Sequence, residues 1–373
     1  MKATVPMVTR RRFCAQAAGA MAGLLVAGGA TGRAATGRAQ AGGAVRRREV
    51  AVGGRRVKTI DVHAHCEIEG IRQMMGGTAT TNRSLIIGPD RLREMDAQGI
   101  DVEVLSINPF WYGVDRDVAG RLITAQNREL AKRCAAYPDR LVGLATVALQ
   151  HPDLAAAQLE EAVTQLGLRG VSIGASANGE DLASNRFDPF WAKAEELGAP
   201  IFLHPQGVTD VVFSAAGRQE LQSRLQGNGV LGNVIGNPLA TTIALSRLIF
   251  EGTLDRFPRL KICAAHGGGY LPSYADRSDH GCLTFPEQCT KTLKKRPTEY
   301  LKQLYFDSLV FSGDALRHLV AVCGISQIVL GTDHPFPWTS TAVDHVLGTS
   351  GLSNADRAAI LGGNAARLLN IPL

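Results

Sequence analysis

Eight short apolar segments recur along this chain and alternate with segments of helical periodicity. The apolar segments occupy residues 59–65, 102–108, 141–149, 170–175, 201–204, 261–266, 304–310 and 328–332. Strands that alternate with helices predict parallel βαβ units, and eight such strands close into a (β/α)8 barrel. We therefore expect an α/β fold with a TIM-like barrel. An open doubly wound sheet is the alternative, and it would spread the strand ends along one edge.

Residues suited to metal binding stand where these segments end. His63 and His65 end the first segment, His204 the fifth, His266 the sixth and Asp333 the eighth. Side chains two residues apart on a strand leave the same face, so His63 and His65 can reach one cation. The C-terminal ends of barrel strands meet at one face, where active sites lie. Histidines with one carboxylate therefore predict a zinc-type metal site at that face.

The segment before the barrel, residues 42–58, predicts a linker and a short β-hairpin. Val50 and Val52 alternate with polar neighbours before Gly53-Gly54, which is a two-residue turn signal. Residues 59–373 then form one large domain, because α/β barrels routinely exceed about 200 residues.

Residues 1–41 differ in composition from the rest and resemble a twin-arginine export signal. Arg10-Arg11-Arg12 is followed by a small apolar stretch over residues 15–30 and by Ala39-Gln40-Ala41, a cleavage motif. The stretch is too short and too rich in glycine and alanine to span a bilayer. We expect the twin-arginine export machinery to carry the protein to the periplasm and this segment to be removed by cleavage. A basic tail or an uncleaved anchor is the alternative.

Charge and cysteine content narrow the class of protein further. Removal of the six basic residues of 1–41 leaves 34 basic residues against 34 acidic ones, so the mature chain has no basic excess to bind nucleic acid. The seven cysteines show no C-x-x-C spacing, which argues against a thiolate zinc site. Cys282 and Cys289 are the nearest pair, and their bonding is left open.

Several sequence blocks together resemble the metal-dependent amidohydrolase superfamily, in particular the branch that contains aminocarboxymuconate-semialdehyde decarboxylase. The resemblance covers nearly all of residues 57–373. Its main carriers are Ile60-Asp61-Val62-His63-Ala64-His65, His204-Pro205, Asn237-Pro238, Phe257-Pro258, Ala265-His266-Gly267-Gly268-Gly269 and Gly331-Thr332-Asp333 with Pro335-Phe336-Pro337.

This resemblance implies a division of labour among the strand-end residues. His63, His65, His204 and Asp333 would bind one divalent ion, most often zinc. His266 would be the acid/base that handles a metal-bound water or hydroxide, and Asp333 could also carry a proton to the substrate. The fourth strand, residues 170–176, has no lysine of the kind that bridges two metals in some relatives, so one metal is expected.

Two arginines match positions that bind the substrate carboxylate in this branch. Arg277 stands eleven residues after His266, where the resemblance implies an arginine that reaches across a homodimer interface. Arg83 is the nearest match to a second one, and a solvated loop charge is an equal reading. Gln206 departs from the pattern, because the decarboxylase carries an aromatic residue there.

The function that follows is decarboxylation of an unsaturated or aromatic carboxylic acid, a carbon–carbon lyase reaction on a small molecule. Hydrolysis of an amide, lactone or ester at the same site is the alternative, and a non-catalytic periplasmic binding protein is a third reading. Asp307 and His334 are weaker candidates, for which interior hydrogen bonding or packing is at least as good an explanation.

Overall fold

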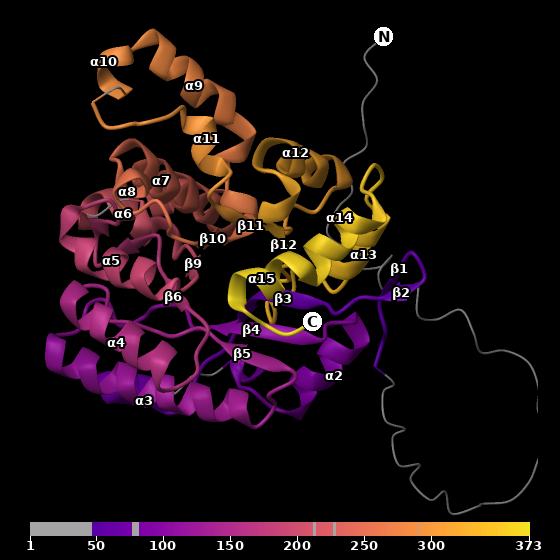
Figure 1. Ribbon diagram of the computed structural model, residues 1–373. Coiled ribbons are helices and arrows are strands. Elements are labelled where there is room, and N and C mark those ends of the chain that lie inside the picture. Colours follow the sequence, from indigo (N-terminus) through magenta and orange to yellow (C-terminus); the bar gives the residue numbers. More distant parts are fainter. Residues whose placement is uncertain (1–46, 77–81, 212–213, 227–228, 290) are drawn as a thin grey trace, which may run out of the picture. The chain divides into compact units, whose positions relative to one another are not determined.

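The computed structural model describes residues 47–76, 82–211, 214–226, 229–289 and 291–373. The predicted export signal lies outside these residues. Eight parallel strands stand at the centre of the structure, ringed by helices (Figure 1). They are β3 (Ile60–His65), β4 (Val102–Ser106), β5 (Leu141–Gly143), β6 (Val171–Ile173), β9 (Ile201–Leu203), β10 (Ile262–Ala264), β11 (Tyr305–Asp307) and β12 (Ile328–Val329).

The eight strands close into a barrel. Three of them form the sheet β3-β4-β5 and five form the sheet β12-β11-β10-β9-β6. Parallel bridges Ala145↔Val171 and Asp61↔Leu330 join the two sheets at both edges. The predicted TIM-like barrel is therefore confirmed, and the open sheet is excluded.

Side chains that alternate along the strands divide between two apolar clusters. Leu105, Leu203 and Ala264 pack in the large cluster that the outer helices share. Val104 and Phe202, one residue away, belong to a smaller cluster inside the barrel, which also includes residues of the last helix. This period of two is the pattern that a closed sheet with helices on its outside requires.

The helices that follow the strands agree closely with the helical segments expected from the sequence. On α3, the Asp115 side chain caps the first turn by accepting from the Val118 amide, and Lys132 and Arg133 complement the helix dipole at the last turn. The outer helices are α2 (Pro89–Gln98), α3 (Arg116–Ala135), α4 (Pro152–Thr164), α5 (Asp188–Leu197), α7 (Asn237–Phe250), α8 (Thr253–Arg256), α12 (Gly313–Cys323), α13 (Ala342–Gly348), α14 (Asn354–Ala358) and α15 (Asn364–Leu369).

The predicted hairpin is present before the barrel. β1 (Ala51–Val52) pairs antiparallel with β2 (Arg55–Arg56). Gly53 and Gly54 form the turn with φ of 57° and 77°, values that glycine adopts without steric cost. A second small hairpin, β7 (Ser176–Ala177) with β8 (Glu180–Asp181), follows β6.

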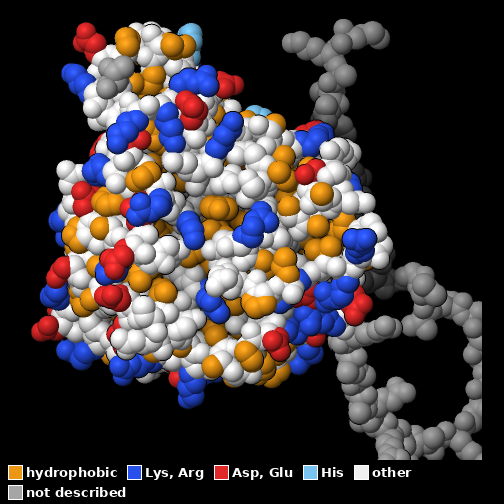
Figure 2. All heavy atoms as spheres, in the orientation of Figure 1, with side chains coloured by type: hydrophobic (Ala, Val, Ile, Leu, Met, Phe, Trp, Pro, Cys, Tyr) orange, Lys and Arg blue, Asp and Glu red, His pale blue; other side chains and the backbone are white. Residues whose placement is uncertain are grey.

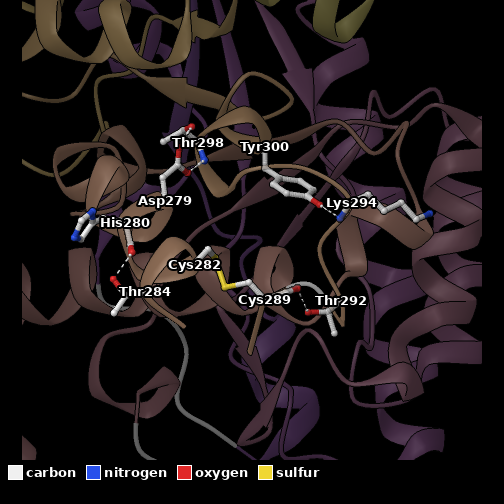
Figure 3. Close-up of a disulfide and its surroundings, with 9 residues drawn as sticks. All are labelled: Asp279, His280, Cys282, Thr284, Cys289, Thr292, Lys294, Thr298 and Tyr300. Atoms are coloured by element: carbon white, nitrogen blue, oxygen red, sulfur yellow. Dashed lines mark hydrogen bonds between the residues drawn. A yellow bond between two sulfur atoms is a disulfide. The ribbon is translucent and has the colours of Figure 1, made fainter. Parts of the chain in front are cut away.

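An arm of three helices leaves the barrel between β10 and β11 (Figure 1). It consists of α9 (Ala275–Thr284), α10 (Pro286–Cys289) and α11 (Pro297–Leu301). A Cys282–Cys289 disulfide joins α9 to α10, and Asp279 binds the amide and hydroxyl of Thr298 at the start of α11 (Figure 3). These links join the three helices of the arm. α9 and α10 each have one buried residue, whereas Pro297, Tyr300 and Leu301 of α11 are buried.

The surface carries both signs of charge. Basic and acidic side chains are interspersed over the face seen in Figure 2. Among the described residues, no helix has both the length and the apolar content needed to cross a membrane.

Candidate metal centre

The predicted ligands of β3 and β12 converge at the C-terminal end of the barrel. The Nε2 atoms of His63 and His65 lie 3.1 Å apart. Asp333 Oδ1 lies 2.9 Å from Nε2 of His65 and 3.2 Å from Nε2 of His63. All three side chains are almost completely buried. Two ring nitrogens and a carboxylate oxygen at such short spacing form the donor arrangement that one cation needs.

His204, at the end of β9, completes this group. Its ring centroid lies 4.6 Å from that of His65 and 5.1 Å from that of His63. Neither of its ring nitrogens has a hydrogen-bond partner among the residues that the structure describes, although both are buried. Burial also lowers the pKa of His204 well below the ordinary value of histidine. The ring is therefore neutral, with a lone pair available to a metal ion.

The backbone at two of these positions is strained. Asp333 has a φ of 63° and His266 a φ of 56°, in the left-handed region that non-glycine residues rarely adopt. The Asp333 amide donates to the His63 carbonyl at 2.7 Å, which fixes the end of β12 against β3. Such strain persists only where the surrounding contacts enforce it, and it is typical of functional positions.

Hydrogen bonds on the far side of two rings fix which nitrogen faces the centre. His63 donates from Nδ1 to Asp307 Oδ2 at 2.6 Å. His65 Nδ1 lies 3.1 Å from Ser106 Oγ, and this hydroxyl in turn lies 3.1 Å from the Ala64 carbonyl that can accept its proton. In both rings Nδ1 is taken by a neighbour, so Nε2 is the nitrogen that faces the centre and that can bind a metal ion once any proton on it is displaced.

Asp307 links the ligand side to the loop that carries His266. Its fully buried carboxylate also accepts from the amides of His266 and Gly267, each at 2.8 Å. Burial acts to raise the pKa of Asp307, but the facing His63 outweighs it and keeps this pKa below the ordinary value. Asp307 thus remains a charged acceptor, in the interior hydrogen-bonding role that the sequence left open.

We expect Asp307→Asn to weaken metal binding by about 10- to 100-fold, the usual cost of losing the hydrogen-bond partner of a metal ligand. The amide keeps the shape of the carboxylate but has no charge to fix the His63 tautomer. Titration against a competing chelator measures this affinity, and the thermal unfolding midpoint of the metal-free variant reports its fold. Unchanged metal affinity would refute the positioning role of Asp307.

The charges at the centre are unevenly distributed. Burial lowers the pKa of His65 to about 4, so this ring is neutral. Burial acts to lower the pKa of His63 as well, but Asp333 and Asp307 outweigh it and raise this pKa to about 10. Burial acts to raise the pKa of Asp333, and the surrounding histidines hold it below its ordinary value instead. Two carboxylates therefore favour a positive charge at this point, which a divalent ion supplies.

His266 lies at the edge of the same group. Its Nε2 is 3.6 Å from Asp333 Oδ2, and its side chain is 15% exposed, against 1% for His65. One set of ligand atoms from His63, His204, His266 and Asp333 lies within 4.8 Å of one another, so distance alone also permits His266 as a ligand. This set contains no atom of His65. The greater exposure of His266 is consistent with the acid/base role that the resemblance implies, which stays a prediction.

The two predicted carboxylate-binding arginines do not lie among these residues. Arg277 is exposed on α9 of the arm, without a hydrogen bond or ion pair to another described residue. Arg83, at the start of a short 3-10 helix (Arg83–Leu85), is exposed and lines a cavity of about 500 Å³ with Glu94 and His334. Nε2 of His334 lies 2.7 Å from Glu94 Oε2, and its Nδ1 lies 2.8 Å from Glu103 Oε1. His334 therefore contacts these carboxylates and not the metal centre, in the structural role expected for it.

Sequence reasoning missed two residues that contact the ligands. Ser106 holds His65, as described above, and it could have been found because it ends β4 in the same way that the ligands end their strands. The ring of Phe336 packs against His65 at 5.4 Å between centroids, and this residue had been noted only as part of a motif.

An eight-stranded parallel barrel with a histidine–aspartate cluster at the C-terminal ends of its strands defines a class of metal-dependent enzymes. The sequence profile of the amidohydrolase family matches residues 60–371, and the chain belongs to this family.

Several relatives of this chain are decarboxylases. The chain is 29% identical over 316 residues to a 2-amino-3-carboxymuconate-6-semialdehyde decarboxylase of Dictyostelium discoideum, covering 84% of this chain and 85% of the relative. It is 31% identical over 302 residues to a gamma-resorcylate decarboxylase of Rhizobium sp., covering 78% of this chain and 89% of the relative.

Solved structures show the same likeness over the whole barrel. The 5-carboxyvanillate decarboxylase of Sphingomonas paucimobilis superposes with a TM-score of 0.74 at 25% identity, covering 85% of this chain and 100% of that one. A dihydroxybenzoic acid decarboxylase of Polaromonas sp. JS666 was solved with bound manganese and the inhibitor 2-nitroresorcinol. It superposes with a TM-score of 0.74 at 26% identity, covering 84% of this chain and 97% of that one.

Proposed function

We propose that this protein is a metal-dependent decarboxylase of an aromatic or unsaturated carboxylic acid. The observation that carries the proposal is the buried cluster of His63, His65, His204 and Asp333 beside the more exposed His266. Relatives that share the barrel and the family decarboxylate such acids, and this supports the same reaction class here.

Zinc is the metal ion that we propose for this centre. A donor set of three imidazoles and one carboxylate suits zinc, and the unpartnered nitrogens of His204 are consistent with a bound cation. The manganese in the Polaromonas relative makes manganese the main competitor. β6 and the residues around it carry no lysine, which supports one metal ion over two.

The residues of this chain divide the reaction between them. A divalent ion held by His63, His65, His204 and Asp333 would supply positive charge that polarises the oxygen atoms of a bound carboxylic acid. His266, whose Nε2 faces Asp333 Oδ2, delivers a proton to the carbon that carries the carboxylate. The carbon–carbon bond then breaks, its electron pair returns to the conjugated system, and carbon dioxide leaves. Burial of His65 and Asp333 excludes water from the ligand side.

Carbon dioxide release tests this proposal. The metal-loaded protein is incubated with a panel of hydroxybenzoic and unsaturated carboxylic acids, and with a matched panel of amides, lactones and esters. Release of carbon dioxide from the first panel, lost in His266→Asn, supports decarboxylation. Turnover of the second panel alone would overturn it in favour of a hydrolase.

We also propose a homodimer in which Arg277 of one copy binds the substrate carboxylate in the other. Arg277 lies away from the cluster of its own chain, on an arm whose Tyr274, Leu283 and Phe285 are exposed. Figure 2 shows apolar side chains on this arm. A second copy of the chain would cover them, and the arginine fork suits a carboxylate.

Mixing two inactive variants is expected to restore activity if this dimer forms. Arg277→Ala and His204→Leu each damage a different half of a shared site, so a mixed dimer keeps one intact site. Unfolding and refolding the two variants together should restore about a quarter of the wild-type activity. Random pairing makes about half of the dimers mixed, and each mixed dimer has one intact site out of two. No restoration, with both variants dimeric by light scattering, would contradict Arg277 acting across the interface.

Export to the periplasm is a further part of the proposal. The basic and apolar segments of residues 1–41 support it, and so does the Cys282–Cys289 disulfide, because such bonds persist in oxidising compartments. Intact-mass measurement of protein from the periplasmic fraction tests it. A full-length mass with the protein retained in the cytoplasm would contradict it.

A further inference from the structure

A peripheral helix, α6 (Ala215–Arg224), has a surface that the fold itself does not use. None of its ten residues is buried. A helix that packs on a protein carries apolar residues at positions i, i+3, i+4 and i+7. Here that spacing is occupied by polar residues, namely Gln219, Gln222, Ser223 and Gln226 just beyond the helix. The polar stripe is therefore not a face that packs on the core.

This stripe forms one wall of a cavity of about 530 Å³. Asn233, in the π-helix Gly232–Gly236, and Asn237, at the start of α7, also line this cavity. Gln206 completes the lining. The volume lies within the range of about 300–1,000 Å³ that is typical of small-molecule sites.

The chemistry of the lining is unusual because it is polar without being charged. Six carboxamides line the cavity, and no aspartate, glutamate, lysine or arginine is among the described residues that do so. A carboxamide offers both donors and acceptors, as a hydroxyl group does. An anionic ligand would select arginine or lysine instead. The cavity therefore matches a ligand that is neutral and rich in hydroxyl groups.

Among the residues that line this cavity, Gln206 is the one nearest in sequence to the metal centre. It follows the proposed ligand His204 by two residues. Its backbone N–H donates to Asp210 Oδ2 at 2.5 Å, and this hydrogen bond holds the turn after β9. A side-chain carbon at Gly174, the residue after β6, would lie 3.2 Å from Gln206 Nε2, so glycine leaves room for the amide there. Gln206 also lines a second cavity of about 240 Å³ with Tyr112 and Ser176. Gln206 thus places one edge of the amide-lined cavity just after β9, the strand that is followed by His204.

We propose that the amide-lined cavity binds an uncharged, hydroxyl-rich group of the substrate, such as a sugar attached to the aromatic acid. This inference rests on the proposed decarboxylase function for its choice of substrate, and on the cavity itself for the attached group. It assigns a role to Gln206, the residue at which the chain departs from the pattern of its relatives.

Binding of a matched pair of ligands tests the inference. The pair is 2,4-dihydroxybenzoic acid and its 4-O-β-glucoside, measured by calorimetry on the metal-loaded protein. The glucoside should bind at least about tenfold more tightly, since two or more additional hydrogen bonds contribute about 1 kcal/mol each. In a Gln219→Leu/Gln222→Leu variant the two ligands should bind equally, while the affinity for the free acid is unchanged. The control Gln165→Leu, at the C-terminal end of α4 and outside the lining of this cavity, should keep the preference.

Two results would overturn the inference. One is the absence of any preference for the glucoside in the wild-type protein, including binding of neither ligand. The other is a preference that survives in the double variant, whose fold is checked by its thermal unfolding midpoint. Failure of the proposed function looks different, because the glucoside would then bind preferentially without release of carbon dioxide from either acid.

Discussion

His204→Leu is expected to abolish stoichiometric metal binding and all metal-dependent activity, while the metal-free protein remains at least as stable as the wild type. Both ring nitrogens of His204 are buried without a hydrogen-bond partner among the described residues. Replacing such a group by an apolar side chain of similar size removes a buried, unsatisfied polar group and breaks no hydrogen bond. The loss of metal affinity should exceed the roughly 10- to 100-fold cost of losing a partner of a ligand.

The control for this experiment is His345→Leu. His345 on α13 (Ala342–Gly348) also has a buried ring nitrogen without a partner, and burial lowers its pKa, but it is not part of the cluster. This variant should keep the metal and the activity. Metal content by mass spectrometry and the unfolding midpoint of the chelated protein are the two measurements. A His204→Leu protein that still holds one metal ion per chain would remove His204 from the ligand set.

His266→Asn is expected to lower kcat by about 10²- to 10⁴-fold, the usual contribution of general acid–base catalysis, with the metal content unchanged. The exposed edge of His266 and the 3.6 Å distance from its Nε2 to Asp333 Oδ2 place it where it can pass a proton to a substrate. Asparagine keeps a hydrogen-bonding side chain but cannot carry the proton.

Metal analysis of the same variant separates the two possible roles of His266. Because its nitrogen also lies within the compact group of ligand atoms, loss of metal in His266→Asn would make it a ligand. His65→Asn should then retain the metal, which reverses the assignment made here. His151→Asn, at the start of α4, is the control and should change neither quantity.

The barrel could be predicted because its determinants are local. Each strand is a short run of apolar residues, often β-branched, and each one that matters for the site ends in a histidine or aspartate, such as His204 or Asp333. The side on which strands end is fixed by their parallel order, so the convergence of these residues followed from the count of eight. The disagreements are small, since most strands are shorter than the apolar runs that announced them.

The arm and α6, which lie outside the barrel, could not be predicted in the same way. The helices of the arm are short, and α6 has no apolar face, so periodicity gave no signal for them. The Cys282–Cys289 bond depends on how α9 and α10 fold back on each other. Sequence spacing identified Arg277 and Arg83 as arginines at positions that match the family pattern. Their distance from the histidine–aspartate cluster depends on tertiary structure, which sequence spacing does not determine.

The most direct test of the account is carbon dioxide release measured together with metal content on one sample of the purified protein. The account predicts one divalent ion per chain, release of carbon dioxide from an aromatic or unsaturated carboxylic acid, loss of both on treatment with a chelator, and recovery of both when zinc or manganese is returned. Decarboxylation that persists at full rate in the metal-free protein would contradict it. So would a protein that holds the metal and decarboxylates none of these acids.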